Sequence, residues 1–187
     1  MRVISGKIRG RRLNAVPGMA TRPTTDKVKE SLFNIIGPYF DGGQSLDLYG
    51  GSGGLSIEAV SRGIDHAMIV DRQYAAIKTI QRNISLTHCD DQFTVLKQDA
   101  RKALRLFGGQ GKQFDLVFLD PPYAKQQILK DITAMVAEGL LRKNALVVCE
   151  TNGEANLPQN LTGFKLFRQH QYGITVLTIY QFQGDNE

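Results

Sequence analysis

The sequence predicts an α/β domain with a mostly parallel sheet, and two observations lead to this class. Between residues 45 and 149, short apolar segments alternate with segments whose apolar residues have helical spacing, a pattern typical of parallel strands joined by right-handed crossover helices. After Glu150 the alternation stops, and residues 164–168 and 174–182 have the pattern of two strands with no helix between them. We therefore expect a doubly wound sheet of seven strands that ends in an antiparallel hairpin.

The expected elements follow one another in a regular order along the chain. The first five strands cover residues 45–49, 67–70, 93–96, 116–119 and 146–149. The helices between them cover residues 55–62, 74–86, 101–107 and 126–138. The fourth strand is an uninterrupted apolar run, Leu116-Val-Phe-Leu119, as expected for a central strand that is covered on both faces.

The positive charge of the chain is concentrated near its start. Residues 1–40 hold 8 Lys and Arg against 2 Asp and Glu, a net charge of +6, whereas residues 41–187 hold 15 against 16, a net charge of −1. We therefore expect a basic N-terminal subdomain, residues 1–40, attached to a nearly neutral ligand-binding domain, residues 41–187. Such a basic arm indicates an anionic polymer or surface as the partner.

The N-terminal subdomain is expected to contain a hairpin and a helix. In residues 2–13, short apolar units alternate with Arg, Lys and Gly, which fits two short strands joined near Gly6 or Gly10. A helix is expected to follow, capped by Thr24 or Thr25.

The composition disfavours several classes of protein. Cys89 and Cys149 have no paired spacing and the three histidines are scattered, so we expect neither a disulfide framework nor a metal site. No segment approaches the ~20 apolar residues of a membrane span, and the start of the chain lacks the apolar region of a signal peptide. We expect a soluble, cytoplasmic protein that does not bind a membrane.

An acidic residue stands at or near the carboxyl end of each of the first four strands. These residues are Asp47, Asp71, Asp99 and Asp120. Because ligands of open parallel sheets bind at the carboxyl ends of the strands, we expect these side chains to line one pocket. Carboxylates accept hydrogen bonds, so they indicate a ligand with hydroxyl and amino groups rather than phosphates.

A glycine-rich turn, Gly50-Gly-Ser-Gly-Gly54, joins the first strand to the next helix. Glycines such as Gly51 and Gly53 let the backbone approach a ligand and leave free N–H groups at the start of the helix. Asp71 lies 20 residues after Gly51 (71 − 51), the spacing at which a carboxylate binds ribose hydroxyls. These features fit both NAD and S-adenosylmethionine, but Ser56 stands where the nicotinamide motif requires its third glycine.

The segment Asp120-Pro-Pro-Tyr123 follows the apolar fourth strand directly. Consecutive prolines fix the backbone and leave their carbonyl groups without competing N–H donors nearby. Asp120 and the Pro121 carbonyl can then accept both hydrogens of an exocyclic NH2 group, while Tyr123 stacks on the ring that carries it, a contact worth ~1–3 kcal/mol. The position of this segment after a glycine turn and a buried strand favours a catalytic role over a loop of packing residues.

The order of these motifs resembles that of a known class of enzymes. The segment Asp47-Leu-Tyr-Gly-Gly-Ser-Gly53, followed by Asp71, Asp99 and Asp120-Pro-Pro-Tyr123, is similar to the class I S-adenosylmethionine-dependent methyltransferases that modify exocyclic amines. The resemblance implies a Rossmann-like fold and S-adenosyl-L-methionine as the cofactor. The last motif is shared with DNA adenine methyltransferases, so it does not by itself identify the base.

The front of the chain narrows the resemblance. Residues 2–13 and 21–33, with Glu58-Ala-Val-Ser-Arg-Gly63, are similar to RsmD, the bacterial family of small-subunit (16S) ribosomal RNA guanine-N2 methyltransferases. The chain departs from the family in two places. Gly50 stands where Ala is usual and Asp71 where Glu is common, and both changes keep the chemistry that the site requires.

The resemblance implies a role for each candidate residue. The target amine would be held by the catalytic residues Asp120, Pro121 and Tyr123. The cofactor would be bound by Asp47, Gly51, Gly53, Asp71 and Asp99, with Asp71 on the ribose and Asp99 on the adenine amine. Two alternatives stay open from the residues themselves: Asp99 instead caps the helix near Arg101, and Asp47 only braces the glycine turn.

The resemblance also implies small-subunit ribosomal RNA as the partner, free or within an assembling subunit, and a monomeric enzyme. The candidate phosphate contacts are Arg2, Lys7, Arg9, Arg11, Arg12 and Arg22. One alternative is a non-catalytic RNA-binding assembly factor, against which the intact Asp120-Pro-Pro-Tyr123 segment argues. Another is a DNA adenine or cytosine amino-methyltransferase, which usually needs a larger recognition region than the arm offers. A nicotinamide-dependent reductase is the weakest alternative, because the third glycine of its motif is missing and the sheet ends in an antiparallel hairpin.

Overall fold

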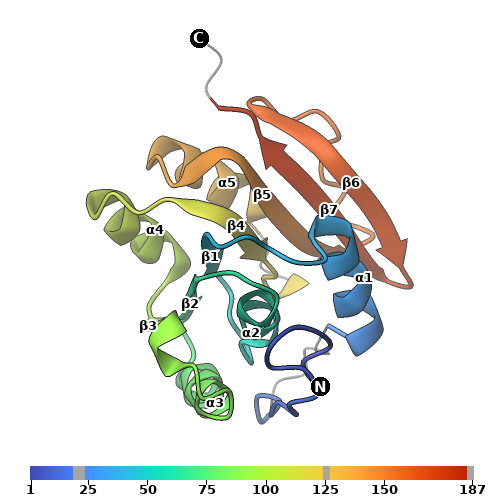
Figure 1. Ribbon diagram of the computed structural model, residues 1–187. Helices are drawn as coiled ribbons and strands as arrows, with labels where there is room; N and C mark the ends of the chain where they lie inside the picture. The colour runs from blue at the N-terminus through green and yellow to red at the C-terminus, as the bar shows by residue number, and fades with distance from the viewer. Residues whose placement is uncertain (19–23, 124–126, 185–187) are drawn as a thin grey trace.

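The strands of the protein form one sheet. The computed structural model describes residues 1–18, 24–123 and 127–184. Its strands are β1 (Gln44–Asp47), β2 (His66–Asp71), β3 (Phe93–Lys97), β4 (Phe114–Leu119), β5 (Leu141–Asn152), β6 (Phe164–Tyr172) and β7 (Thr175–Phe182). They lie in the order β3-β2-β1-β4-β5-β7-β6, and β7 is antiparallel to both of its neighbours (Figure 1). The predicted seven-stranded, mostly parallel sheet with an antiparallel C-terminal hairpin is confirmed.

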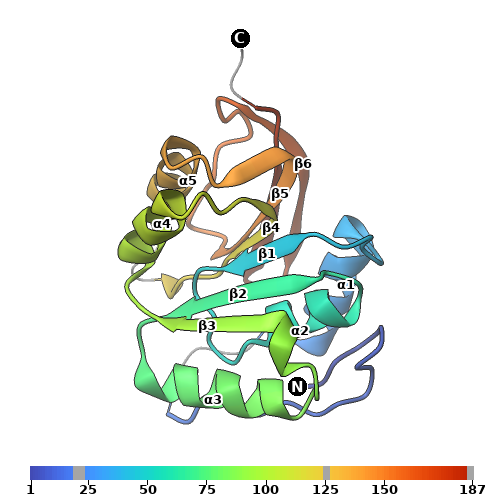
Figure 2. The ribbon, with the colours of Figure 1, turned by 60° about the vertical axis from the view of Figure 1, so that its left-hand side comes forward.

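Helices cover both faces of the sheet (Figure 2). They are α1 (Asp26–Ile36), α2 (Gly54–Ser61), α3 (Tyr74–Ser85), α4 (Ala100–Gly109) and α5 (Ile128–Ala137). Buried side chains of α1, α2 and α3 form one apolar cluster with the sheet, and those of α4 and α5 form a second. Thr25 caps α1, with its hydroxyl accepting from the Val28 N–H at 3.3 Å. No helix of the described residues is long and apolar enough to cross a membrane.

The strand order reverses beside β1. Strands β2 and β3 lie on one side of β1, whereas β4 and β5 lie on the other. The connections that leave β1 and β4 therefore diverge, which leaves a crevice outside the carboxyl ends of these two strands. This arrangement of the sheet fixes where a ligand can enter.

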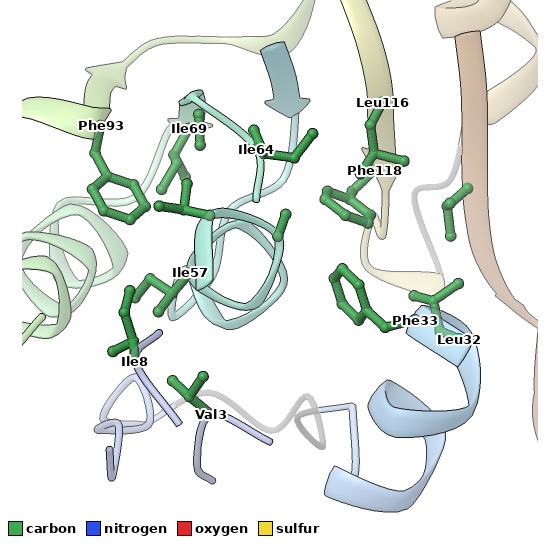
Figure 3. Close-up of a cluster of buried hydrophobic side chains, with 14 of the residues drawn as sticks. Val3, Ile8, Leu32, Phe33, Ile57, Ile64, Ile69, Phe93, Leu116 and Phe118 are labelled. Atoms are coloured by element: carbon green, nitrogen blue, oxygen red, sulfur yellow. The ribbon is translucent and has the colours of Figure 1, made fainter. Parts of the chain in front are cut away.

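The N-terminal segment, residues 1–15, packs along α2. Val3, Ile8 and Leu13 are at most 7% exposed and belong to the same apolar cluster as Phe33 of α1 and Ile57 of α2. Figure 3 shows Val3 and Ile8 beneath Ile57, whereas Phe33 lies farther along the cluster, next to Phe118. The basic side chains of the segment are exposed, whereas these three apolar ones, Val3, Ile8 and Leu13, are part of the core that covers the sheet.

The N-terminal segment contains one isolated antiparallel bridge, between Arg2 and Arg12, where the sequence predicts two short strands. The physical reason is that α2 takes up backbone groups that a partner strand would need. The N–H groups of Ile4 and Ser5 donate to the two carboxylate oxygens of Glu58, at 2.9 and 3.1 Å. The segment is therefore a loop fastened to a helix rather than a free hairpin.

Glu58 also holds a buried ion cluster together. Its Oε2 lies 3.3 Å from the Nζ of Lys29, and its Oε1 lies 2.8 Å from the Nε of Arg62. All three side chains are nearly inaccessible to solvent, with 2% exposure at most. Burial lowers the pKa of Lys29, and the adjacent Glu58 carboxylate opposes that change. This cluster joins the N-terminal segment, α1 and α2.

Candidate active site

A cavity of about 1200 Å³ opens at the carboxyl ends of the parallel strands. Asp47, Asp71, Asp99 and Asp120 all line it. They follow or end β1, β2, β3 and β4, which all run in the same direction. The structure thus brings together four carboxylates that are far apart in the sequence.

The glycine turn forms the floor between β1 and α2. Gly51 and Gly53 have φ angles of +56° and +80°, a left-handed conformation that favours glycine. A Cβ atom on Gly50 would lie 2.4 Å from the Cγ2 of Ile69, whereas one on Gly51 would meet open space. Gly51 lines the cavity, but Gly53 does not and acts as the N-cap of α2. No side chain caps this helix, so its first N–H groups remain available.

Asp71 and Asp47 hold the turn from two sides. Asp71 accepts from the N–H of Gly51 at 3.0 Å and from that of Gln73 at 2.8 Å. Asp47 accepts from the N–H of Tyr49 at 3.3 Å and from the hydroxyl of Ser56 at 3.4 Å. Asp47 is only 2% exposed, and this burial raises its pKa to about 7. Both carboxylates therefore brace the turn and also face the cavity.

Asp99 caps α4. Its Oδ1 accepts from the N–H groups of Arg101 and Lys102, at 3.1 and 3.3 Å. Asp99 also lines the cavity and is exposed. The two alternatives for this residue are compatible, because both capping bonds use the same oxygen.

The segment Asp120-Pro-Pro-Tyr123 forms one wall of the cavity. Burial, together with the nearby carboxylates of Glu150 and Asp47, raises the pKa of Asp120 well above its ordinary value. Tyr123 is 40% exposed at the rim, so its ring is accessible to an incoming base. An acceptor at the base of the wall and an aromatic ring at its edge suit an aromatic amine.

Glu150 was not among the residues predicted from the sequence. It lies near the end of β5, is 6% exposed and lines the cavity beside Asp120. The hydroxyl of Thr24 donates to its Oε2 at 2.7 Å. The four aspartates were predicted because each lies at or near the carboxyl end of a predicted strand. The same rule would have found Glu150, which directly follows the predicted strand 146–149.

Two further contacts tie the cavity walls together. The hydroxyl of Tyr49 donates to Asp131 of α5 at 2.6 Å, and both residues line the cavity. On the other side, Ser31 of α1 is hydrogen-bonded to Tyr172, next to the turn between β6 and β7. No sequence pattern indicates either pair, because the partners are separated by 82 and 141 residues.

The predicted RNA-binding residues that the structure describes do not line the cavity. Lys7, Arg9, Arg11 and Arg12 are exposed on the N-terminal segment, and Arg22 lies outside the described residues. The Lys7 N–H donates to the Ser61 carbonyl at the end of α2, whereas Met1 contacts Ser52 before its start. An eight-residue helix is about 12 Å long, so Lys7 lies at the end of α2 opposite to the glycine turn. Arg12, in contrast, pairs with Arg2, next to the cavity-lining Met1.

The described residues contain no cluster of His, Cys, Asp and Glu that could hold a metal ion. The strand order, the antiparallel β7 and the acidic cavity define a Rossmann-like class I methyltransferase fold. A solved structure of YhhF from Escherichia coli shares this fold, with a TM-score of 0.83, 29% identity and 99% of each chain covered.

Residues 1–181 match the family model described as Conserved hypothetical protein 95. The chain belongs to this family, which is the RsmD family. YlbH of Bacillus subtilis (strain 168) is 45% identical over 184 residues, covering 98% of this chain and all of the relative. A relative from Haemophilus influenzae, named Ribosomal RNA small subunit methyltransferase D, is 33% identical, covering 97% of this chain and 93% of its own.

Proposed function

We propose that the protein transfers a methyl group from S-adenosylmethionine to the exocyclic N2 amine of one guanine in small-subunit ribosomal RNA. The observation that carries this proposal is the Asp120-Pro-Pro-Tyr123 wall, which shares one cavity with three further strand-end carboxylates. The name of the Haemophilus relative supports small-subunit rRNA as the substrate. The proposed catalytic residues and the cofactor-binding aspartates line one cavity of a single chain, which supports a monomeric enzyme acting on free RNA or on an assembling subunit.

The lining of the cavity fits the cofactor. Asp71 would bind the ribose hydroxyls, and Asp99 would accept from the adenine amine. The uncapped start of α2 and the open space at Gly51 leave room for the methionine part. Its ammonium group would stabilise the ionised form of Asp47, whose pKa of about 7 reflects burial.

When bound, the cofactor would supply an electrophilic methyl group: the lone pair of the amine forms the new N–C bond, and the electron pair of the broken C–S bond stays on sulfur. An exocyclic amine conjugated with a purine is a poor nucleophile. Asp120 and the Pro121 carbonyl would accept its two hydrogens and direct its lone pair, which is a positioning effect. Tyr123 would hold the base after it leaves its stack, at a cost of a few kcal/mol. The product ammonium then releases its extra proton to water or to a carboxylate of the pocket.

The experiment that tests this function is mass spectrometry of the nucleosides of small-subunit rRNA. We expect N2-methylguanosine at one position to disappear in cells that lack the gene and to return with the wild-type gene. A plasmid carrying Asp120→Ala should fail to restore it. An unchanged nucleoside profile after deletion would contradict the proposal.

The exposed basic side chains of the N-terminal segment have a separate expected effect on RNA affinity. Replacing Arg9, Arg11 and Arg12 with Ala should weaken RNA binding at low salt and reduce the slope of log K against log salt by roughly 0.7–0.9 for each phosphate that the variant no longer neutralises. These side chains are exposed, so the substitutions should leave the fold unchanged. Filter-binding titrations across salt concentrations measure the slope.

A matched control removes the same charge elsewhere on the surface. It replaces three exposed basic residues with Ala, namely Arg82, Arg105 and Lys165. The control should lower RNA affinity less and leave the salt slope close to that of the wild type. Equal slopes for the two triple variants would show that the N-terminal segment does not contact phosphates.

A further inference from the structure

The cavity wall at the ends of β4 and β5 has a feature that can distinguish one base from another. The two strands are parallel, and Leu119 lies opposite Cys149. Asp120 directly follows the end of β4, and Glu150 follows Cys149 within β5, so the two residues are neighbours where strands about 4.8 Å apart reach the cavity. Both residues line the cavity. The wall that faces the target base thus presents two adjacent carboxylates.

Glu150 has a fixed orientation and an unused oxygen. Thr24 holds its Oε2 with a hydrogen bond of 2.7 Å. Within the part of the chain that the structure describes, Oε1 accepts no hydrogen bond and no basic side chain pairs with this carboxylate. Burial raises the pKa of Glu150, as it does for Asp120. A buried carboxylate beside a second, partly buried one is costly unless a ligand supplies donors to both.

Guanine supplies donors in this arrangement. Its N1–H and its N2 amine lie next to each other on the Watson–Crick edge, so one carboxylate can accept from each. Adenine carries an unprotonated N1 beside its amine, and cytosine an unprotonated N3 beside its own. Either lone pair would face a carboxylate and be repelled. A flipped base is read along this same edge.

We propose that Glu150 selects guanine by accepting the N1–H while Asp120 holds the N2 amine. This assignment rests on the proposed function and makes Glu150 a specificity-determining residue. Thr24 is then a positioning residue, because it acts on the base only through the Glu150 carboxylate. The hydroxyl of Thr24 also connects base selection to the N-terminal part of the chain.

The test replaces the target guanine with 2-aminopurine, which keeps the N2 amine but carries a lone pair at N1. We expect the wild-type enzyme to methylate the 2-aminopurine RNA with a kcat/KM at least about 100-fold below that for guanine. In Glu150→Gln the amide can donate to that lone pair. Activity on guanine should fall roughly 10- to 100-fold, and the guanine preference should shrink at least tenfold. 2-Aminopurine also lacks the O6 of guanine, and this loss affects the wild type and Glu150→Gln alike. The change in the guanine to 2-aminopurine ratio of kcat/KM between the two enzymes therefore reports on Glu150 alone.

Two further variants complete the experiment. Glu154→Gln removes an exposed acid four residues further on and should leave both rates unchanged. Thr24→Val keeps the Glu150 charge and removes its anchor, so the guanine preference should fall by a smaller factor. If Glu150→Gln does not fold, as judged by circular dichroism, Thr24→Val decides the question.

Three outcomes would overturn the inference. The first is equal activity of the wild type on both RNAs, and the second is an unchanged preference in Glu150→Gln. The third is an unchanged guanine preference in Thr24→Val, which overturns the inference if Glu150→Gln does not fold. A wild-type enzyme that transfers no methyl group to guanine N2 would instead refute the proposed function, and this assignment with it.

Discussion

The variant Asp120→Ala is expected to lose methyl transfer almost completely while still binding S-adenosylmethionine. Asp120 is the only carboxylate within the segment Asp120-Pro-Pro-Tyr123, which forms one wall of the cavity. Without it the target amine loses the acceptor that directs its lone pair. Misplacement of a reacting group commonly costs 100-fold or more, so we expect a loss of roughly 10³-fold in kcat.

Single-turnover transfer of labelled methyl groups to small-subunit rRNA measures this loss, and calorimetric titration measures cofactor binding. Asp120→Asn keeps the shape and one acceptor oxygen, so it should retain more activity than Asp120→Ala. Asp91→Ala removes an exposed carboxylate of the 3-10 turn before β3 and should behave as the wild type. Near-normal turnover of Asp120→Ala would refute the role given to this residue.

A second large effect is expected on stability, from Glu58→Gln. The substitution leaves Lys29 and Arg62 buried without their counter-charge, and breaking a buried ion pair in this way typically costs about 3–5 kcal/mol. It also weakens the acceptor for the N–H groups of Ile4 and Ser5. Since small domains are stable by only about 5–15 kcal/mol, the variant should lose a large part of its stability, or its N-terminal segment should detach.

Urea denaturation followed by circular dichroism measures the free energy of unfolding. Glu30→Gln removes an exposed carboxylate from α1 and should change stability by less than about 0.5 kcal/mol. The double variant Glu58→Gln with Lys29→Met removes charges on both sides and should recover part of the loss. A Glu58→Gln protein as stable as the wild type would show that the buried ion cluster does not hold the segment.

The sequence predicts the strands β1, β2 and β4 closely because they are short and largely buried. It predicts β5 less well, as residues 146–149 instead of Leu141–Asn152. The reason is an irregularity in which Phe114 pairs with Leu141 but Leu116 pairs with Leu146. Near its start β5 contains the polar residues Arg142, Lys143 and Asn144, and Asn144 has a φ of +69°, so the continuous apolar run begins only after them.

The edge strand β6 is also longer than the sequence predicts, for a different reason. The sequence predicts residues 164–168, but the strand continues to Tyr172. Gln169, His170 and Gln171 are exposed, and an edge strand with an exposed outer face needs no apolar alternation. Hydrogen bonding to β7 alone extends it.

For the site, the sequence could identify groups that the chain itself places at strand ends. Strand direction alone predicts that four of these groups meet in one cavity, namely Asp47, Asp71, Asp99 and Asp120. The link between Thr24 and Glu150 could not be found in this way, because it joins residues 126 positions apart. The fastening of the N-terminal segment by Glu58 has the same origin, since that contact is a product of packing.

These long separations have a consequence for the order in which the molecule becomes structured. The Ile4 N–H finds its acceptor 54 residues later, Thr24 finds its partner 126 residues later, and Ser31 finds Tyr172 141 residues later. During synthesis the N-terminal region emerges first, yet its contacts are completed only when β6 has been made. Closing such large loops costs conformational entropy, and contacts between residues far apart in the sequence therefore form slowly. The contacts of the N-terminal segment with α2 can therefore form early in translation, whereas those of Thr24 and Ser31 wait for β5 and β6. A message truncated before β6 should yield a protein whose N-terminal segment docks on α2 but whose α1 lacks its hydrogen bond to Tyr172.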